Sequence, residues 1–206
     1  MIKNRSLSSL SWLRRHRNDI YVRKSKYHGF RSRSWFKISE IQKKDKIFYS
    51  GMVVIELGSS PGGWSQFILN EIGITGYLVS CDIIEMKVLE GMDFVHGNIY
   101  NLKTVNNILG KVKNRKVQVV LSDISPNLSG ISIIDISKFT YLIKFLLCTF
   151  YDVISSRGKF LIKVFQGEDF EDSLKEISYL FKEVKIRKPK SSRFNSREVY
   201  IVATKK

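Results

Sequence analysis

Residues 51–67 read GMVVIELGSSPGGWSQF, and the order of residue types in this stretch predicts the fold. The run 52–57 is short, mostly apolar and β-branched, which is typical of a strand buried on both faces of a parallel sheet. The glycines, serines and proline of residues 58–63 favour a tight turn, and a helix is predicted from residue 64. A strand, a glycine turn and a helix begin a nucleotide-cofactor site, although such a turn is often only a tight connection.

The turn lacks the two common phosphate-binding signatures. It contains neither the Gly-Lys-Ser/Thr of a phosphate loop nor the G-x-G-x-x-G of a dinucleotide site. A second apolar run, residues 76–82, ends in Asp82, where such folds place a carboxylate that accepts hydrogen bonds from ribose hydroxyls. S-adenosylmethionine, which has a ribose but no phosphate, is therefore the leading cofactor candidate. A nicotinamide oxidoreductase is a distant alternative.

Strand and helix patterns alternate along the rest of the chain. Further strands are expected at residues 91–98, 117–123 and 158–164, and helices at residues 34–41, 102–109, 136–154 and 168–180. Two last β runs, 181–187 and 198–204, are joined by a short basic loop, so the final strand must be antiparallel. The pattern predicts a doubly wound, Rossmann-like α/β methyltransferase fold with a mostly parallel seven-stranded sheet. The carboxyl ends of its strands would carry Gly62, Asp82, Asn98 and Asp123 on one rim.

Length and charge indicate the domain organisation and the kind of partner. The 206 residues are 43% apolar, which suits one core, so we expect a single domain at residues 31–206 after a basic, partly disordered arm at residues 1–30. The net charge is +16, and residues 1–46 alone carry 14 Lys/Arg against 3 acids, a net +11. Such a field attracts polyanions, which indicates nucleic acid. A genomic bias towards lysine would explain the lysines but not the clustered arginines.

Aromatic residues are interleaved with the charges of the arm. Trp12, Tyr21, Tyr27 and Phe30 lie between lysines and arginines. Rings placed in this way either stack on nucleotides or dock on the domain. Both interpretations stay open from the sequence.

The sequence lacks the signatures of a disulfide, a membrane span, a signal peptide and a metal site. Cys81 and Cys148 fall in a predicted strand and a predicted helix, so we expect buried thiols rather than a disulfide, and a reducing cytoplasm. No apolar run approaches the ~18 residues that span a membrane, and the first residues do not resemble a signal peptide. The histidines have no partners at ligand spacing, so no metal site is expected. We expect a cytoplasmic monomer.

The acceptor of the methyl group can be narrowed by elimination. Methylation of a base carbon usually requires a cysteine nucleophile in an exposed loop, and neither Cys81 nor Cys148 is expected in one. Methylation of an amine usually requires an Asn/Asp-Pro-Pro-aromatic turn, whereas residues 123–127 read DISPN. A hydroxyl acceptor such as a ribose 2′-hydroxyl remains, and it needs a base. Lys163 interrupts the apolar strand 160–165, and burial and a nearby cation both favour a neutral, proton-accepting amine. The alternative is a strand-end lysine that reaches solvent.

From about Arg31 to the C-terminus the sequence resembles the FtsJ/RrmJ (RlmE) family of large-subunit ribosomal RNA 2′-O-ribose methyltransferases. The matching runs are RSRSWFK at 31–37, PGGWSQ at 61–66, SD at 122–123 with PN at 126–127, KVFQG at 163–167, and residues 191–203. The Lys-Asp-Lys-Glu tetrad of the family falls on Lys37, Asp123, Lys163 and Glu198. The resemblance implies that Lys163 accepts the proton, that Lys37 and Asp123 assist it, and that Glu198 has a lesser, orienting role.

The resemblance also implies the cofactor site and the substrate. Gly62 and Trp64 would line the methionine and adenosine side, Asp82 would hold the ribose, and Asp123 would lie near the methionine end. Asn98 stands where the family generally has an Asp that accepts from the adenine amino group, so we expect weaker cofactor affinity.

The family substrate is a uridine in the A loop of large-subunit ribosomal RNA, modified within the assembled large subunit. For this chain we expect RNA contacts from Arg31, Arg33, Lys37, Arg193 and Arg197. Two other functions remain open: 2′-O-methylation of transfer RNA or a messenger cap, and a non-catalytic role in ribosome assembly.

Overall fold

The computed structural model of the protein describes residues 19–126, 132–167, 170–193 and 196–206. Residues 1–18 of the arm, with Trp12, and Asn127 of the matching runs lie outside the described residues. Within the described part, no helix is long and apolar enough to cross a membrane.

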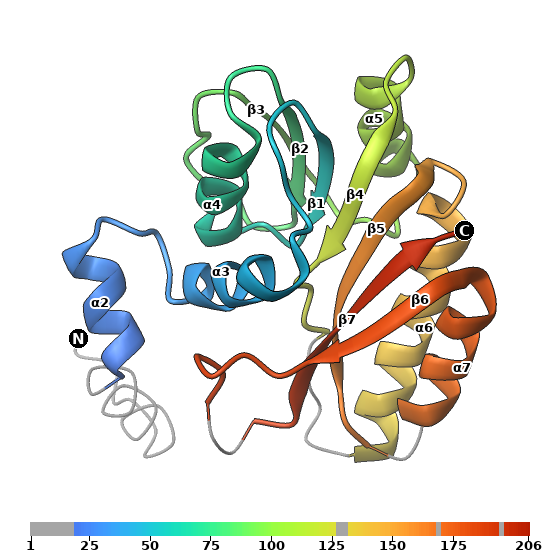
Figure 1. The fold of residues 1–206 in the computed structure, drawn as a ribbon. Helices are drawn as coiled ribbons and strands as arrows, with labels where there is room; N and C mark the ends of the chain where they lie inside the picture. Colours follow the sequence, from blue (N-terminus) through green and yellow to red (C-terminus); the bar gives the residue numbers. More distant parts are fainter. Residues whose placement is uncertain (1–18, 127–131, 168–169, 194–195) are drawn as a thin grey trace, which may run out of the picture.

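A seven-stranded sheet forms the centre of the molecule (Figure 1), and its strand order is β3-β2-β1-β4-β5-β7-β6. The strands are β1 Val53–Leu57, β2 Tyr77–Asp82, β3 Met92–His96, β4 Val117–Ser122, β5 Ile154–Phe165, β6 Phe181–Arg187 and β7 Glu198–Lys205. Neighbouring strands among the first five are parallel, and β7 runs antiparallel to both β5 and β6. The predicted sheet, with its antiparallel last strand, is confirmed.

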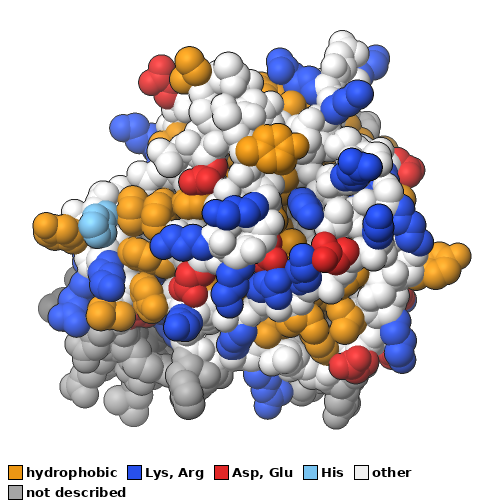
Figure 2. All heavy atoms as spheres, in the orientation of Figure 1, with side chains coloured by type: hydrophobic (Ala, Val, Ile, Leu, Met, Phe, Trp, Pro, Cys, Tyr) orange, Lys and Arg blue, Asp and Glu red, His pale blue; other side chains and the backbone are white. Residues whose placement is uncertain are grey.

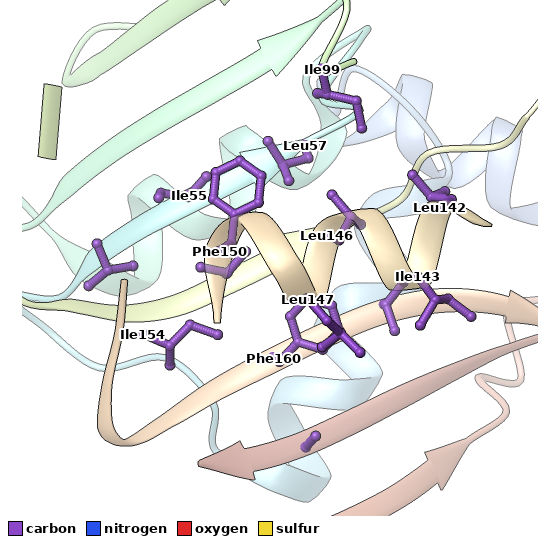
Figure 3. Packing of buried hydrophobic residues seen from close by; sticks show 14 of the residues in the cluster. Ile55, Leu57, Ile99, Leu142, Ile143, Leu146, Leu147, Phe150, Ile154 and Phe160 are labelled. Carbon is purple, nitrogen blue, oxygen red and sulfur yellow. The ribbon is translucent and has the colours of Figure 1, made fainter. Parts of the chain in front are cut away.

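Helices cover both faces of the sheet because the apolar side chains of its central strands alternate between them. Ile55 and Leu57 of β1 belong to the core formed with α5, α6 and α7, and Figure 3 shows Leu146 and Phe150 of α6 close to them. Val54 faces the opposite core, formed with α3 and α4. The helices are α2 Ile20–Tyr27, α3 Ser34–Asp45, α4 Gly63–Ile72, α5 Leu102–Val112, α6 Ser132–Phe150 and α7 Phe170–Leu180.

Helix α2 lies in the predicted arm and was not expected from the sequence. Asp19 caps its N-terminus, since its side chain accepts hydrogen bonds from the backbone N–H groups of Tyr21, at 2.9 Å, and Val22, at 3.4 Å. Val22 and Ser25 of α2 are buried. Tertiary packing and a cap therefore stabilise a segment whose charged composition argued against a stable helix.

Two expectations about α6 and its surroundings were wrong. The helix ends at Phe150 rather than at residue 154, and β5 already begins at Ile154. Tyr151 and Val153 between them continue the apolar pattern, which does not separate a helix end from a strand start. Cys148 was expected to be buried but is exposed, whereas Cys81 is buried. Leu146, Leu147 and Phe150 fill the inward face of α6, and Cys148 falls outside that face.

Candidate active site

The glycine turn after β1 is bound to the carboxyl end of β2. The backbone N–H of Gly58 donates to the carbonyl of Cys81 at 2.8 Å, and that of Ser60 donates to Asp82 Oδ2 at 2.8 Å. Gly62 then begins the turn into α4 with a φ of 99°, a conformation that glycine adopts without strain. The turn and Asp82 therefore form one continuous edge of the site.

Gly62 and Gly63 also allow a close approach that the sequence did not reveal. A Cβ atom on Gly62 would lie 2.7 Å from Arg31 Nη1, and one on Gly63 would lie 2.8 Å from Ser34 Oγ. The segment before α3 therefore packs directly on the turn. The approach of a ligand to the same glycines stays a prediction.

Trp64 is placed differently from the glycines before it. Its side chain is buried, its Nε1 donates to the carbonyl of Ser34 at 2.9 Å, and its ring lies 5.6 Å from that of Tyr200. Trp64 therefore joins α4 to α3 and β7 in the core. Its predicted contact with a cofactor stays a prediction.

Asp82 ends β2, and Asn98 and Asp123 follow β3 and β4. The parallel pairing of β2 with β1 and β3, and of β4 with β1, brings the three residues to one edge, as predicted. Asp82 Oδ1 accepts from the backbone N–H of Ile84 at 2.9 Å, and Asn98 Oδ1 from that of Tyr100 at 3.0 Å. Both side chains are thus oriented by their own loops, and each acceptor oxygen keeps a second lone pair.

Lys163 and Asp123 come together at the carboxyl ends of β5 and β4. Lys163 is 7% exposed, which excludes the alternative of a strand-end lysine in solvent. Its Nζ lies 3.3 Å from Asp123 Oδ1 and donates to the Asp123 carbonyl at 2.6 Å. A buried amine therefore faces the same rim as the glycine turn.

Lys37 and Glu198 form the other half of the predicted tetrad. Lys37 Nζ lies 2.5 Å from Glu198 Oε1, and both side chains are largely buried. The Glu198 carboxylate is enclosed between Lys37 and Tyr200.

The hydroxyl of Tyr200 connects the two halves of the tetrad and was missed from the sequence. It lies 3.1 Å from Asp123 Oδ1 and 2.9 Å from Glu198 Oε1, and it accepts from Lys37 Nζ at 3.2 Å. Because a hydroxyl has one hydrogen, it donates to one of the carboxylates at a time. The alternation of β7 points Tyr200 to the same face as Glu198, and this spacing of two is the signal that could have identified it.

The model of the FtsJ-like methyltransferase family matches residues 30–206, which is most of the chain. The chain belongs to the FtsJ-like methyltransferase family. The family uses S-adenosylmethionine, so this chain is a methyltransferase that depends on that cofactor.

Solved structures show the same fold at low sequence identity. A Plasmodium falciparum protein provisionally described as a ribosomal RNA methyltransferase superposes with a TM-score of 0.75 at 24% identity, over 85% of this chain and 98% of that one. A Lactococcus lactis protein provisionally described as a hemolysin has a TM-score of 0.59 at 14% identity, over 86% and 89% of the two chains. A chain of the fibrillarin/Nop5p complex has a TM-score of 0.59 at 16% identity, over 84% and 83%.

Electrostatics hold the charges of this methyltransferase site in defined states. Burial would raise the pKa of the Glu198 carboxyl, but Lys37 next to it, with Lys163 and the Tyr200 hydroxyl, brings that pKa below its usual value. Burial, followed by the charges of Asp123 and Glu198, raises the pKa of Tyr200 well above its usual value. Tyr200 therefore keeps its proton and Glu198 its negative charge.

A buried carboxyl group beneath the glycine turn was also missed from the sequence. Glu56 of β1 is 1% exposed, and its Oε2 accepts from Ser65 Oγ at 2.5 Å and Ser80 Oγ at 2.7 Å. Burial, only partly offset by these hydrogen bonds, raises the pKa of Glu56 to about 7. Glu56 Oε1 has no hydrogen-bond partner among the described residues.

A pocket of about 190 Å³ lies beside the tetrad and is lined by Arg33, Lys37, Arg193, Ser196 and Glu198. The Asp19 carboxylate interacts with Arg33 and lies 3.9 Å from Arg193 Nε. Three of the five predicted RNA-binding residues therefore meet at this pocket.

The other two predicted RNA-binding residues lie elsewhere. Arg197 is exposed just before β7, and Arg31 lies over the glycine turn, where its Nη1 donates to the carbonyls of Pro61, at 3.4 Å, and Lys87, at 2.5 Å. Arg31 thus joins the glycine turn to the loop after β2.

Proposed function

We propose that this enzyme transfers a methyl group from S-adenosylmethionine to the ribose 2′-hydroxyl of a uridine in the A loop of large-subunit ribosomal RNA, within the assembled large subunit. The observation that carries the proposal is the buried pair of Lys163 and Asp123 at the carboxyl ends of β5 and β4, on the same rim as the glycine turn. A hydroxyl acceptor needs such a base because it must lose its proton to react. An amine acceptor depends less on a base.

Each member of the tetrad has a distinct part in this proposal. Lys163 accepts the proton of the 2′-hydroxyl, and Asp123 orients the amine and stabilises the ammonium that forms. Lys37 adds positive charge near the reacting oxygen, and Glu198 orients Lys37 through the contact of 2.5 Å. The Tyr200 hydroxyl lies between the two carboxylates and donates to one of them at a time.

The residues on the rim fit the cofactor that the family uses. Ser59 in the glycine turn is buried, and its Oγ has no hydrogen-bond partner in the described ranges, so a polar group is available there for a ligand. We place the ribose at Asp82, the adenine at Asn98, and the methionine end near Gly62 and Asp123, with Trp64 supporting the turn. Bound S-adenosylmethionine supplies the activated methyl group.

Positive charge on the described surface supports an RNA substrate. The pocket next to Glu198 contains Arg33, Lys37 and Arg193, with a volume of about 190 Å³. These side chains, together with Arg31 and Arg197, would bind phosphates on either side of the target nucleotide. Such contacts make affinity fall steeply with salt. The low identity of the Plasmodium falciparum protein limits its support to the fold, so the ribosomal substrate rests on the resemblance of the sequence motifs.

Methyl transfer to isolated large ribosomal subunits tests the proposal. Subunits from a strain that lacks the enzyme are incubated with labelled S-adenosylmethionine and the purified protein, and the labelled ribose is then mapped. We expect one labelled uridine in the A loop with wild-type protein and none with Lys163→Met. Label on transfer RNA or on a messenger cap, with none on subunits, would overturn the assigned substrate. Restored subunit assembly by Lys163→Met in cells would favour the non-catalytic role instead.

A further inference from the structure

A row of aromatic rings runs from the core outward along the junction of α2 and α3. The ring of Trp35 lies 5.2 Å from that of Phe67 in the core. Phe30 stacks on Trp35 with centroids 4.0 Å apart and planes at 7°, and His28 stacks on Phe30 at 5.4 Å and 21°. The edge contact between Tyr27 and His28, at 5.1 Å and 86°, ends the row. The residues before α3 thus build a continuous aromatic ladder.

Burial falls steadily along this ladder. Phe67 is 4% exposed, Trp35 and Phe30 are half-buried, His28 is exposed, and Tyr27 is 87% exposed. The inner rings attach α2 to the domain by removing apolar surface from water. The two outer rings remove little, so packing does not account for them. A single exposed tyrosine is ordinary, but a tyrosine that ends a continuous ladder offers a preformed aromatic surface.

Positive charge surrounds the outer end of the ladder. Arg23, Lys24 and Lys26 of α2 are all exposed, and the helix itself contains no acidic residue. Figure 2 shows a histidine among hydrophobic side chains over this part of the surface, with lysine and arginine side chains next to them. A single-stranded nucleic acid presents flat bases and charged phosphates. Exposed rings can stack on the bases, and the cations next to them can bind the phosphates.

We propose that Tyr27 and His28 form a stacking site for an unpaired base of the RNA substrate, while Lys24 and Lys26 bind the adjoining phosphates. This inference rests on the proposed function, because the ligand is taken to be the RNA that the enzyme methylates. Among the arm aromatics that the structure describes, Phe30 docks on Trp35 and Tyr21 docks on Phe36 at 5.2 Å, whereas Tyr27 is assigned to RNA in this proposal.

The ladder is connected to the catalytic region through α3. Trp35 and Lys37 are two residues apart on this helix and therefore point in different directions, one towards the ladder and the other towards Glu198. A base held at Tyr27, the last residue of α2, would be connected through the ladder to α3, the helix that carries Lys37. The stacking site would thus restrict the position of the RNA relative to the tetrad without touching the reacting atoms.

Binding of short RNAs to the full-length protein tests the site. The probe is a fluorescently labelled ten-nucleotide oligo(A), compared with a duplex of the same length, and anisotropy gives the affinity. We expect Tyr27→Ala to weaken single-strand binding by about tenfold, Tyr27→Leu to weaken it similarly, and Tyr27→Phe to leave it within about twofold, because stacking requires a ring. Duplex binding should not respond, since its bases are already stacked. Equal binding by wild type and Tyr27→Ala would refute the stacking site.

Two controls make the result specific. Tyr179→Ala removes another exposed tyrosine, 81% accessible on α7, and should bind RNA like wild type. Replacing Lys24 and Lys26 together by Ala should reduce the salt dependence of single-strand binding, whereas Tyr27→Ala should leave that slope unchanged. A flatter slope for Tyr27→Ala would overturn the proposal, because it would show a lost phosphate contact instead of a lost stack.

Methyl transfer separates this inference from the proposed function. On large ribosomal subunits we expect Tyr27→Ala to raise KM with little change in kcat, since the reacting groups are intact. If wild-type protein transfers no methyl group to subunits, the proposed function fails, while the oligo(A) comparison still decides the stacking site. If wild type is active and KM is unaltered by Tyr27→Ala, the stacking site fails alone. Thermal unfolding should be the same for both proteins because Tyr27 is exposed.

Discussion

Lys163 is held by Asp123 at two separate atoms. Its Nζ donates to the main-chain carbonyl of Asp123 at 2.6 Å and lies 3.3 Å from the carboxylate Oδ1. The position of the amine therefore depends on the backbone at the end of β4, and the charge opposite it depends on the side chain. These two contributions can be separated by mutation, because Asp123→Asn removes the charge but keeps the carbonyl.

Lys163→Met should lower methyl transfer by about 10²- to 10⁴-fold, the usual contribution of a general base. The methionine keeps most of the apolar volume in a site that is 7% exposed, so the fold should persist. Asp123→Asn should give a smaller loss, because the carbonyl still positions the amine. Single-turnover rates at saturating cofactor measure both. A Lys163→Met enzyme of wild-type rate would remove Lys163 from the reaction.

Tyr200→Phe should destabilise the protein by about 1 to 2 kcal/mol, because buried groups lose a hydrogen-bond partner. Tyr200 is 0% exposed, and its hydroxyl lies within hydrogen-bonding distance of Lys37, Asp123 and Glu198. We expect a smaller loss of rate than for Lys163→Met, since Tyr200 acts through the tetrad. Urea denaturation and kcat are the measurements. Unchanged stability would mean that the hydroxyl is not part of the network.

Glu56→Gln should change how stability depends on pH. The pKa of Glu56 rises from 4.5 to about 7 on folding, mainly through burial. The folded protein then binds the proton more tightly than the unfolded chain, so the contribution of Glu56 to stability falls as the pH rises from about 4.5 to 7. This corresponds to about 3 kcal/mol at most, a penalty that a neutral glutamine does not have.

Denaturation of wild type and Glu56→Gln at pH 5 and pH 8 gives the check. The difference in unfolding free energy between the two proteins should move in favour of the variant at the higher pH. Other titrating groups cancel in this difference, because both proteins contain them. A pH-independent difference would show that Glu56 is not protonated preferentially in the folded state.

Arg31→Ala should weaken cofactor binding by about fivefold, a typical effect of losing hydrogen bonds to backbone carbonyls. The Arg31 guanidinium joins the carbonyls of Pro61 and Lys87, and so connects the glycine turn to the loop after β2. Calorimetry with S-adenosylmethionine measures the change. Arg23→Ala, at an exposed position of α2, is the matched control. Equal affinities of both variants for S-adenosylmethionine would contradict the prediction, and the predicted RNA contact would then be the remaining role of Arg31.

Asn98→Asp should tighten cofactor binding by roughly fivefold, because a carboxylate accepts a stronger hydrogen bond than an amide. Asn98 Oδ1 already accepts from the backbone of Tyr100 at 3.0 Å, and an aspartate can keep this contact while it faces the adenine amino group. Calorimetry compares the two proteins. No change in affinity would place Asn98 away from the adenine.

The order of strands and helices was predictable because it depends on patterns within a few residues. The glycine turn, the buried strands around it and the acids that follow them were all visible in the sequence, and the sheet confirms their arrangement. Element ends were less predictable. The start of β5 at Ile154 depends on its pairing with Val117 of β4, and no local pattern contains that information.

The site shows the same division at the level of single residues. The sequence by itself determined the fold and the family motifs, and its resemblance to the family predicted the four tetrad residues. Only the tertiary structure decided that Glu198 is enclosed, that Tyr200 joins both halves of the tetrad, and that Glu56 is buried with a raised pKa. The physical reason is distance along the chain. Lys37 and Glu198 are separated by 161 positions, so their burial and their charge states are set only when the folded sheet brings them into contact.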